Sequence, residues 1–322
     1  MIPESPSTRW TILPLALCIL AATGCSLKTY AINMVGNALS SGDSVYESDD
    51  DVELVGNALP FGLKLTESLL AQSPNNRGLL LTACRGFVLY SYAYVHYPAE
   101  LAADDDLDRA RALRGRARRL YLRAFQYGIR GLERSYPGFG SALVNDSRSA
   151  VRTIKAKNKA EDVPLLYWSA ASLGLAISVS PDDAALLARL PDVQALLDRA
   201  LELDEAWDDG ALHEFKMVLA SATPGEPDWA SIKMHYDRAL ELSRGKSASA
   251  YLAYAEAVSL PRQDAAEFRS LVQQALSVDP DAEPKTRLVN LLAHRRARWL
   301  ESRVDELIFE DEPLESAEGK RQ

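Results

Sequence analysis

The sequence predicts an all-α fold in which antiparallel helix pairs stack into a curved array. Apolar residues recur at three- and four-residue steps through most of the chain, which is the period of amphipathic helices. The 17 glycines and 16 prolines among the 322 residues fall mainly between these periodic segments, as expected where short loops join helices. A third observation, a helical phrase that recurs in the second half of the chain, predicts how the helices are arranged.

The recurring phrase centres on an Ala-Leu pair. It reads LLDRALEL at 196–203, YDRALEL at 236–242 and VQQALSV at 272–278. The shared alanines are Ala200, Ala239 and Ala275, which are 39 and 36 residues apart. A period of this length, with a small residue where paired helices cross, predicts a tetratricopeptide-like superhelical array. Each pair in such an array buries only part of its apolar surface, and stacking buries the rest.

In the first half of the chain we expect looser copies of these pairs. A helical hairpin is expected over 52–72 and 77–97, and a long amphipathic helix over 107–135. Residues 162–179 are apolar almost all round, which predicts a central buried helix with Asp162 as its N-cap.

In the second half, each Ala-Leu helix should have a partner. These partner helices are expected at about 208–220, 247–259 and 284–309. The helical domain is therefore expected to span residues 52–309, and the polar residues 310–322 are expected to form a disordered tail.

The first 24 residues have the pattern of a secretory signal peptide. Arg9 precedes a short apolar run at 12–22, which small residues follow. The alternative, a transmembrane helix, needs roughly 20 apolar residues. The sequence Ala22-Thr23-Gly24-Cys25 resembles a bacterial lipobox, which implies that Cys25 is acylated and becomes the first residue of the mature chain. Ser26, in place of an aspartate, then implies delivery to the outer membrane.

The mature chain should begin with a tether. Residues 25–51 are interpreted as the lipidated N-terminus, a short amphipathic helix over 27–40 and an acidic linker over 41–51. Asp51 and the acids before it stand where the next helix needs a cap. Cys84 lies in an apolar run and is expected to be a small buried side chain, so no internal disulfide is predicted.

Composition argues against a nucleic-acid partner. The 45 acidic and 36 basic residues give a formal net charge of -9, whereas nucleic-acid binding normally requires a basic face. Seven arginines do lie between Arg109 and Arg123, but they alternate with an apolar stripe of helical period. We therefore interpret them as the solvated face of an amphipathic helix.

No catalytic or metal-binding motif was found in the sequence. His213-Glu214 begins like the zinc-protease pattern HExxH, but Met217 stands where the second histidine should be. The four histidines are scattered, and the chain has no GxSxG elbow, phosphate loop or CxxC pair. We therefore predict neither a metal nor a cofactor, and no enzymatic activity.

Three phrases together resemble a known family. They are EDVPLLYW at 161–168, DDGALHEF at 208–215 and RRARWL at 295–300. With the lipobox and the Ala-Leu repeats, they are similar to the T-component (TatT) family of TRAP transporters over about residues 25–309. The resemblance implies a periplasmic lipoprotein that works beside a tripartite ATP-independent periplasmic transporter. It also implies a homo-oligomer that associates with the transporter's substrate-binding component and handles an apolar small ligand.

The matching phrases contain the first candidate site residues. Tyr167 and Trp168 lie in the central helix, where they either pack in the core or line a ligand cleft. Asp209, His213 and Glu214 stand near a helix start. Asp209 is expected to cap that helix, His213 lies four residues on and within reach of an ion pair with it, and Glu214 is either a surface charge or part of the cleft.

A second group of candidates lies at the two ends of the helical domain. Tyr90, Tyr94 and Tyr97 can share one face of the second helix, where they would line an interface or a groove. Arg295, Arg296 and Arg298 are expected on a solvated face.

Two functions remain open at this point. The first is an accessory component of a transporter, held on the periplasmic side of a bacterial membrane by its lipid. The alternative is an assembly scaffold for an outer-membrane or secretion machine, as tetratricopeptide lipoproteins often are.

Overall fold

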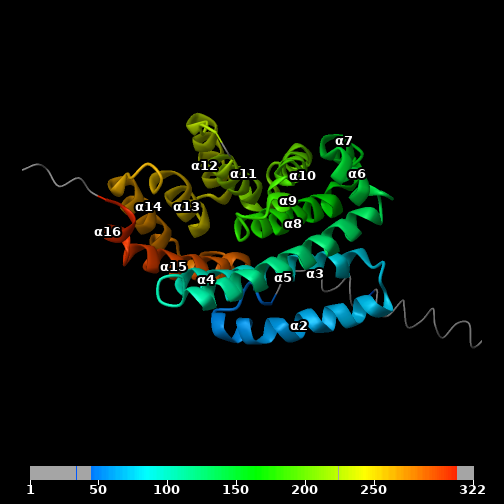
Figure 1. Cartoon of the computed structure of the whole chain (residues 1–322), viewed down its shortest axis with the longest axis horizontal. Coiled ribbons are helices and arrows are strands. Elements are labelled where there is room, and N and C mark those ends of the chain that lie inside the picture. The colour runs from blue at the N-terminus through cyan, green and yellow to red at the C-terminus, as the bar shows by residue number, and fades with distance from the viewer. Residues whose placement is uncertain (1–33, 35–44, 224, 310–322) are drawn as a thin grey trace, which may run out of the picture.

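The computed structural model describes residues 34, 45–223 and 225–309, and in these residues every regular element is helical (Figure 1). This confirms the all-α class. The predicted signal peptide, Cys25 and the tail at 310–322 lie outside the described residues, as does the short helix over 27–40 except for Met34.

The first half of the domain contains the predicted hairpin and the long helix. Its helices are α2 (Val52–Gln72), α3 (Arg77–Ser91), the π-helix η1 (Tyr92–His96), α4 (Tyr97–Leu101), α5 (Leu107–Glu133), α6 (Phe139–Asn145), α7 (Ser147–Arg152), the 3-10 turn η2 (Ala156–Asn158) and α8 (Lys159–Ser178). Asp51 caps α2 as expected, because its side chain accepts the backbone N–H of Leu54.

The second half contains the Ala-Leu helices and their partners. Its elements are α9 (Ala184–Leu187), α10 (Leu190–Leu203), the 3-10 turn η3 (Trp207–Gly210), α11 (Ala211–Ala222), α12 (Trp229–Ser243), α13 (Ala248–Tyr254), the π-helix η4 (Ala255–Ser259), α14 (Ala265–Ser277), the 3-10 turns η5 (Pro280–Ala282) and η6 (Pro284–Thr286), α15 (Arg287–Glu301) and α16 (Val304–Leu307). Successive helices contact one another from α10 to α15.

The alanines of the repeated phrase lie where helices cross. Ala200, Ala239 and Ala275 are 0%, 2% and 0% exposed. The crossing at Ala239 is close, because a Cβ added to Gly210 would lie 3.0 Å from the carbonyl oxygen of Ala239. Gly210, at the end of η3, therefore has little room for a side chain against the backbone of α12.

Helix α8 forms the centre of the larger core, as the sequence predicts. It packs against α3, α5 and α10, and Leu166 and Leu173 are completely buried. The predicted cap is wrong, since α8 begins at Lys159 and Asp162 lies inside its first turn. Asp162 is 0% exposed. Its buried carboxylate pairs with Arg77 and accepts a hydrogen bond of 2.6 Å from the hydroxyl of Tyr136.

The continuous helical stretch from Arg77 to Leu101 is long and apolar enough to cross a membrane by length and composition. It nevertheless packs against α2, α5 and α8, as the core helix of a folded domain does. Cys84 is a free, buried thiol on this helix, as expected, and burial raises its pKa.

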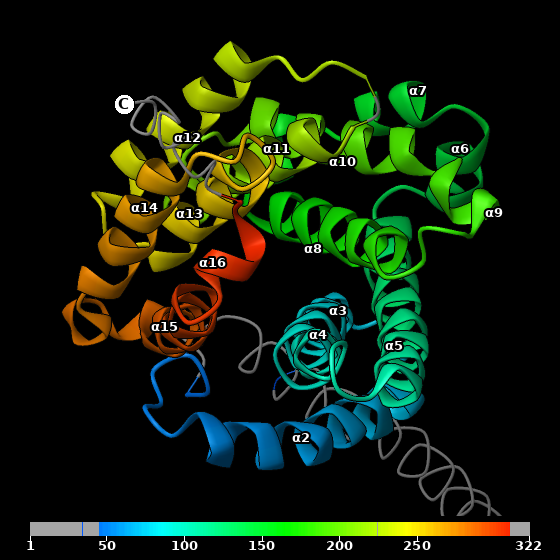
Figure 2. The same ribbon diagram turned by 60° about the vertical axis from the view of Figure 1, so that its left-hand side comes forward.

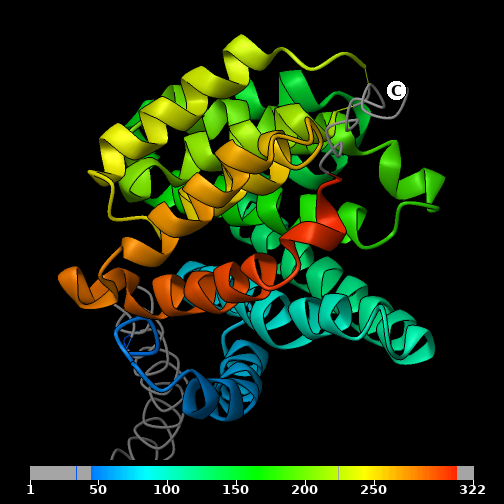
Figure 3. The ribbon, with the colours of Figure 1, turned by 90° about the vertical axis from the view of Figure 1, so that its left-hand side faces the viewer.

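The two ends of the helical domain meet, so the helices form a closed ring (Figure 2). Leu288 at the start of α15 packs against Val52 and Val55 of α2, and its backbone N–H donates to the carbonyl of Glu47 over 2.9 Å. Figure 3 shows α15, in orange to red, running alongside the cyan helices of the first half.

Candidate functional site

Four aromatic rings contact one another around Tyr167. The ring centroid of Tyr167 lies 5.0 Å from that of Trp168, 4.7 Å from Trp207 and 6.1 Å from Phe215. Helix α8 provides the first two residues, the η3 turn provides Trp207 and α11 provides Phe215. All four are only partly buried, so the cluster forms an accessible aromatic wall as well as part of the core. Sequence reasoning missed Trp207 and Phe215, which become neighbours of Tyr167 only through the packing of α8 against the later helices.

The η3 turn points two adjacent carboxylates in different directions. Asp208 and Asp209 both have a φ of 50°, and Gly210 follows with a φ of 100°. Left-handed backbone is uncommon for residues other than glycine and costs free energy at each of the two aspartates. Asp209 pairs with Lys285 at 2.5 Å and does not cap α11, so the cap prediction is wrong.

Asp208 has a different environment from Asp209. It is exposed, and its carboxyl has no hydrogen bond or ion pair with any residue that the structure describes, although its backbone carbonyl accepts the N–H of Ala211. Burial raises the pKa of its carboxyl, Arg85 and Lys285 lower that pKa, and Asp209 raises it.

Glu214 lies on the inner side of α11. Its Oε2 accepts hydrogen bonds from the hydroxyls of Ser249 at 3.1 Å and Ser247 at 3.4 Å. Burial raises the pKa of Glu214 to about 7; the two serines lower that pKa and Asp208 raises it. The interpretation of Glu214 as a surface charge is therefore wrong.

His213 points away from this carboxyl, because consecutive residues of a helix are rotated by about 100°. It is 4% exposed; its Nε2 lies 3.2 Å from Glu205 and its Nδ1 lies 2.8 Å from Nδ1 of His235. The expected ion pair with Asp209 is not formed, since His213 pairs with Glu205 instead. The structure thus separates His213 from the aromatic wall.

Arg296 joins helices from the two ends of the domain. Its guanidinium donates to Glu100 over 2.5 Å and to Glu256 over 2.5 Å, and it lies 4.5 Å above the ring of Trp299. With 19% of its side chain exposed, Arg296 does not lie on the expected solvated face. Burial raises the pKa of Glu256 even though Arg296 lowers it.

Two π-helices place residues at this ion-pair cluster. Glu256 lies in η4, and His96 at the end of η1 contacts Glu100 at 3.3 Å and the Tyr121 hydroxyl at 3.1 Å. A π-helical turn inserts one residue and so rotates the side chains that follow it.

Tyr92, the first residue of η1, lies where the charges of the ion-pair cluster and of Glu214 act on its phenol. Its side chain is 49% exposed, yet burial is the largest cause that raises its pKa. Glu256, Glu100 and Glu214 raise this pKa further, whereas Arg296 lowers it. We refer to the residues on this inner side as the inner surface; they are Tyr92, Tyr167, Trp168, Trp207, Asp208, Glu214, Phe215 and Glu256.

The three other candidate tyrosines lie at the closure of the ring. Tyr90 stacks on Tyr94 at 5.8 Å, and the Tyr94 hydroxyl donates to the carbonyl of Val52 over 2.7 Å. The Tyr97 hydroxyl lies 3.5 Å from the carbonyl of Arg295. These contacts attach η1 to α2 and α4 to α15.

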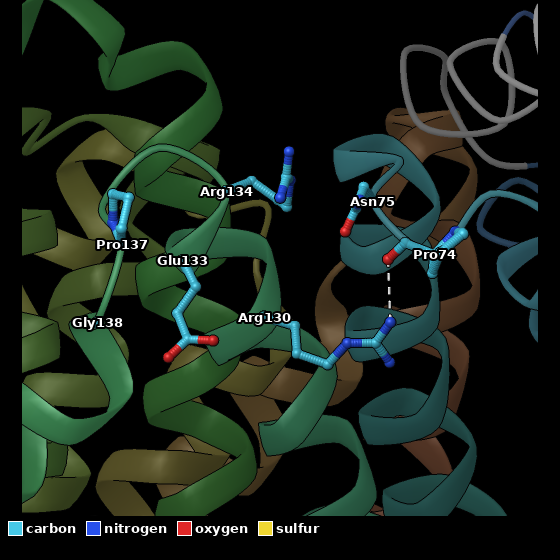
Figure 4. A pocket seen from close by; sticks show the side chains of 7 residues that line it. All are labelled: Pro74, Asn75, Arg130, Glu133, Arg134, Pro137 and Gly138. Atoms are coloured by element: carbon cyan, nitrogen blue, oxygen red, sulfur yellow. Dashed lines mark hydrogen bonds between the residues drawn. The ribbon is translucent and has the colours of Figure 1, made fainter.

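A separate surface hollow lies between the loop before α3 and the end of α5 (Figure 4). Arg130 donates to the carbonyl of Pro74 there over 3.0 Å, and Glu133 accepts the backbone N–H of Gly140 over 3.1 Å. None of the candidate site residues lines this hollow. Over the described ranges, no group of three or more His, Cys, Asp or Glu side chains is placed to hold a metal ion.

Comparison with known proteins identifies the family. An uncharacterized protein of Treponema pallidum (strain Nichols) is 29% identical over 323 residues, which cover 95% of this chain and 100% of the relative. The family model described as TRAP transporter T-component matches residues 48–308. The chain therefore belongs to the TRAP transporter T-component family.

Proposed function

We propose that this protein is a periplasmic, lipid-anchored accessory component of a TRAP transporter. In this role it binds the transporter's substrate-binding component and takes up a largely apolar small ligand on the inner surface. Family membership supports the link to the transporter. The anchor rests on the lipobox at Cys25.

The observation that carries the ligand part of the proposal is the aromatic wall around Tyr167. Partly accessible rings of three residue types, from α8, η3 and α11, contact one another next to a few polar groups. Ligand sites usually combine mostly apolar walls with few oriented polar groups. Covering such rings with an apolar ligand contributes about 25 cal/mol for each Å² removed from water.

Native mass spectrometry and calorimetry on the mature chain test this proposal. The chain from residue 25 onward would carry Cys25→Ser, so that lipid does not interfere. It would be mixed with the cognate substrate-binding component and, separately, with extracted periplasmic metabolites. We expect a complex with the partner and a retained ligand, and the same spectra report the number of copies in the expected homo-oligomer.

Trp168→Ala is the informative variant. It removes an indole of the wall and should weaken ligand binding at least tenfold while the partner complex persists. Arg119→Glu, on the exposed face of α5, is the matched control and should change neither. The absence of both a ligand and a partner complex would favour the assembly scaffold instead.

A further inference from the structure

The outward face of α2 carries an apolar stripe. Its members are Leu54, Ala58, Phe61 and Leu65. At 100° per residue they fall within about 60° of arc, opposite the buried residues of the helix. Leu54, Phe61 and Leu65 are 56%, 74% and 47% exposed, whereas a surface helix normally presents polar side chains on this side. A contiguous apolar patch of this kind indicates a surface that contacts a partner or a membrane.

The charged side chains of α2 are all held in ion pairs. The helix has three of them, and none belongs to the apolar stripe. Glu53 pairs with Arg295 at 2.7 Å. Lys64 and Arg123 of α5 both pair with Glu67, and Lys64 does so at 2.7 Å. The outward face of α2 can therefore enter an apolar medium without desolvating an unpaired charge of this helix.

An arginine stripe on α5 contacts the C-terminal part of α2. It consists of the exposed Arg109, Arg116, Arg119, Arg123 and Arg130, which lie three, four or seven positions apart. Arg123 pairs with Glu67, and Arg130 donates to the carbonyl of Pro74, in the loop after α2, over 3.0 Å. The other members and Arg130 form no ion pair with any residue that the structure describes. The acidic residues 49–51 stand at the opposite end of α2, so the positive charge beside its C-terminal part is not cancelled there.

The chain reaches α2 directly from the predicted lipid. Cys25 precedes Asp51, the N-cap of α2, by 26 positions, so even a fully extended tether keeps this helix within about 90 Å of the anchor. A Cβ added to Gly62 would lie 3.0 Å from the hydroxyl of Tyr46, so the chain that enters the domain lies beside this helix. A tethered surface meets the membrane at high effective concentration, and a few apolar and basic side chains then suffice to hold it there.

We propose that α2 lies on an anionic phospholipid membrane. The apolar stripe enters the boundary between head groups and acyl chains, and the arginine stripe of α5 contacts the phosphates of the head groups. This inference rests on the proposed function, because the lipid at Cys25 is what brings the protein to the membrane. It leaves α12, which lies on the opposite side of the molecule from α2 in Figures 1 and 2, in the aqueous phase.

Fluorescent labels on two helices test which face meets the membrane. Phe61→Cys on α2 and Met234→Cys on α12 each place one reactive thiol at an exposed apolar position, since Met234 is 51% exposed and Cys84 is buried. The chain from residue 25 onward, with Cys25→Ser, carries an N-terminal histidine tag that holds it on vesicles containing nickel-chelating lipids. The tag replaces the predicted lipid, so the result does not depend on acylation.

The label at position 61 should report entry into the membrane. On vesicles of phosphatidylglycerol and phosphatidylethanolamine, nitroxide groups on the lipid chains should quench this label and shift its emission to the blue. The label at position 234 should show neither change. Without vesicles, aqueous iodide should quench both labels.

Variants in the chain labelled at position 61 separate the two stripes. The ratio of quenched to free label should fall about tenfold or more with Leu54→Gln and Leu65→Gln together, on anionic and on phosphatidylcholine vesicles alike. Arg116→Gln and Arg119→Gln should each lower the ratio about fivefold on anionic vesicles and leave it unchanged on phosphatidylcholine. Arg148→Gln, on α7 and away from α2 in Figures 1 and 2, is the matched control and should keep the ratio.

Other outcomes would overturn the inference. Equal quenching at positions 61 and 234, or none at either, means that α2 is not the helix that lies on the membrane. If the label at position 61 is already shielded from iodide without vesicles, a second copy or residues 27–40 of the same chain cover the stripe instead. Arginine variants that keep their ratio on anionic vesicles would disprove the contact with phosphates. A wild-type chain without an acyl group at Cys25 would overturn the anchor alone, since the tagged chain tests α2 without it.

Discussion

At the scale of single residues, Glu214 shows how packing changes the chemistry of a side chain. The sequence allows a charge on the surface of α11. Burial raises the pKa of this carboxyl to about 7, so it carries a proton for part of the time near neutral pH. The hydroxyls of Ser247 and Ser249 reduce this effect but do not cancel it.

Glu214→Gln should change how stability depends on pH. A carboxyl with a raised folded-state pKa contributes stability below its unfolded value near 4.5, and the contribution is lost as the pH rises through 7. The glutamine variant should therefore be more stable than wild type by about 1–3 kcal/mol at pH 8 and nearly equal at pH 5. Urea unfolding across this range is the measurement, and an equal difference at both pH values would contradict the expectation.

At the scale of elements, two departures from regular α-helix matter most. The π-helices η1 and η4 lie 163 positions apart at their first residues, Tyr92 and Ala255, yet both place side chains at the Arg296 cluster. Insertions of this kind are frequent at functional sites. The Ala-Leu phrases, in contrast, are regular helices whose small residues allow close crossings.

Ala239→Leu should overpack one of these crossings. Ala239 is 2% exposed and lies against Gly210, whose added Cβ would come within 3.0 Å of its carbonyl oxygen. We expect a loss of about 1–3 kcal/mol in the free energy of unfolding. Ala230→Leu, on the exposed side of the same helix, is the control. Equal free energies of unfolding for the two variants in denaturant would contradict a close crossing at Ala239.

At the scale of the whole molecule, the closure of the ring depends on contacts between the two ends of the domain. Arg296 reaches Glu100, which is 196 residues away, and Leu288 completes an apolar cluster with Val52 and Val55. One ion-pair cluster and one apolar cluster therefore hold the two ends of the domain together.

Arg296→Ala should weaken this closure. It leaves Glu100 and Glu256 partly buried without their cation, which should cost about 2–3 kcal/mol. Hydrogen exchange should become faster in α15 and α2. Arg295→Ala is the matched control, because its pair with Glu53 is more exposed and should matter little. Unchanged exchange in α15 for Arg296→Ala would mean that other contacts close the ring.

Cys25→Ser tests the membrane attachment of the whole protein. Without the thiol that carries the lipid, the chain should remain an unprocessed precursor with no acyl group. Mass spectrometry and fractionation of cells measure both properties. If the wild-type chain is instead cut at another position and carries no lipid, the predicted anchor at Cys25 is wrong.

Much of the fold could be predicted from the sequence, because helices and their crossings depend on local pattern. The period of the apolar residues places most helices to within a few residues, and Ala200, Ala239 and Ala275 are buried as predicted. The three resemblance phrases, which were recognised in the sequence, indicate the family that the comparison confirms. Asp162 could not be placed correctly, since its partner Arg77 is 85 residues away.

The sequence by itself determined the helical class, the crossings and the family, since each of these depends on residues close together in the chain. Only the tertiary structure decided that the two ends of the domain meet and that Arg296 bridges them. These facts depend on pairs such as Arg296 and Glu100, whose separation of 196 residues leaves no local pattern. They also depend on the π-helical turn at Tyr92–His96, which rotates side chains away from the regular helical period that a sequence reveals.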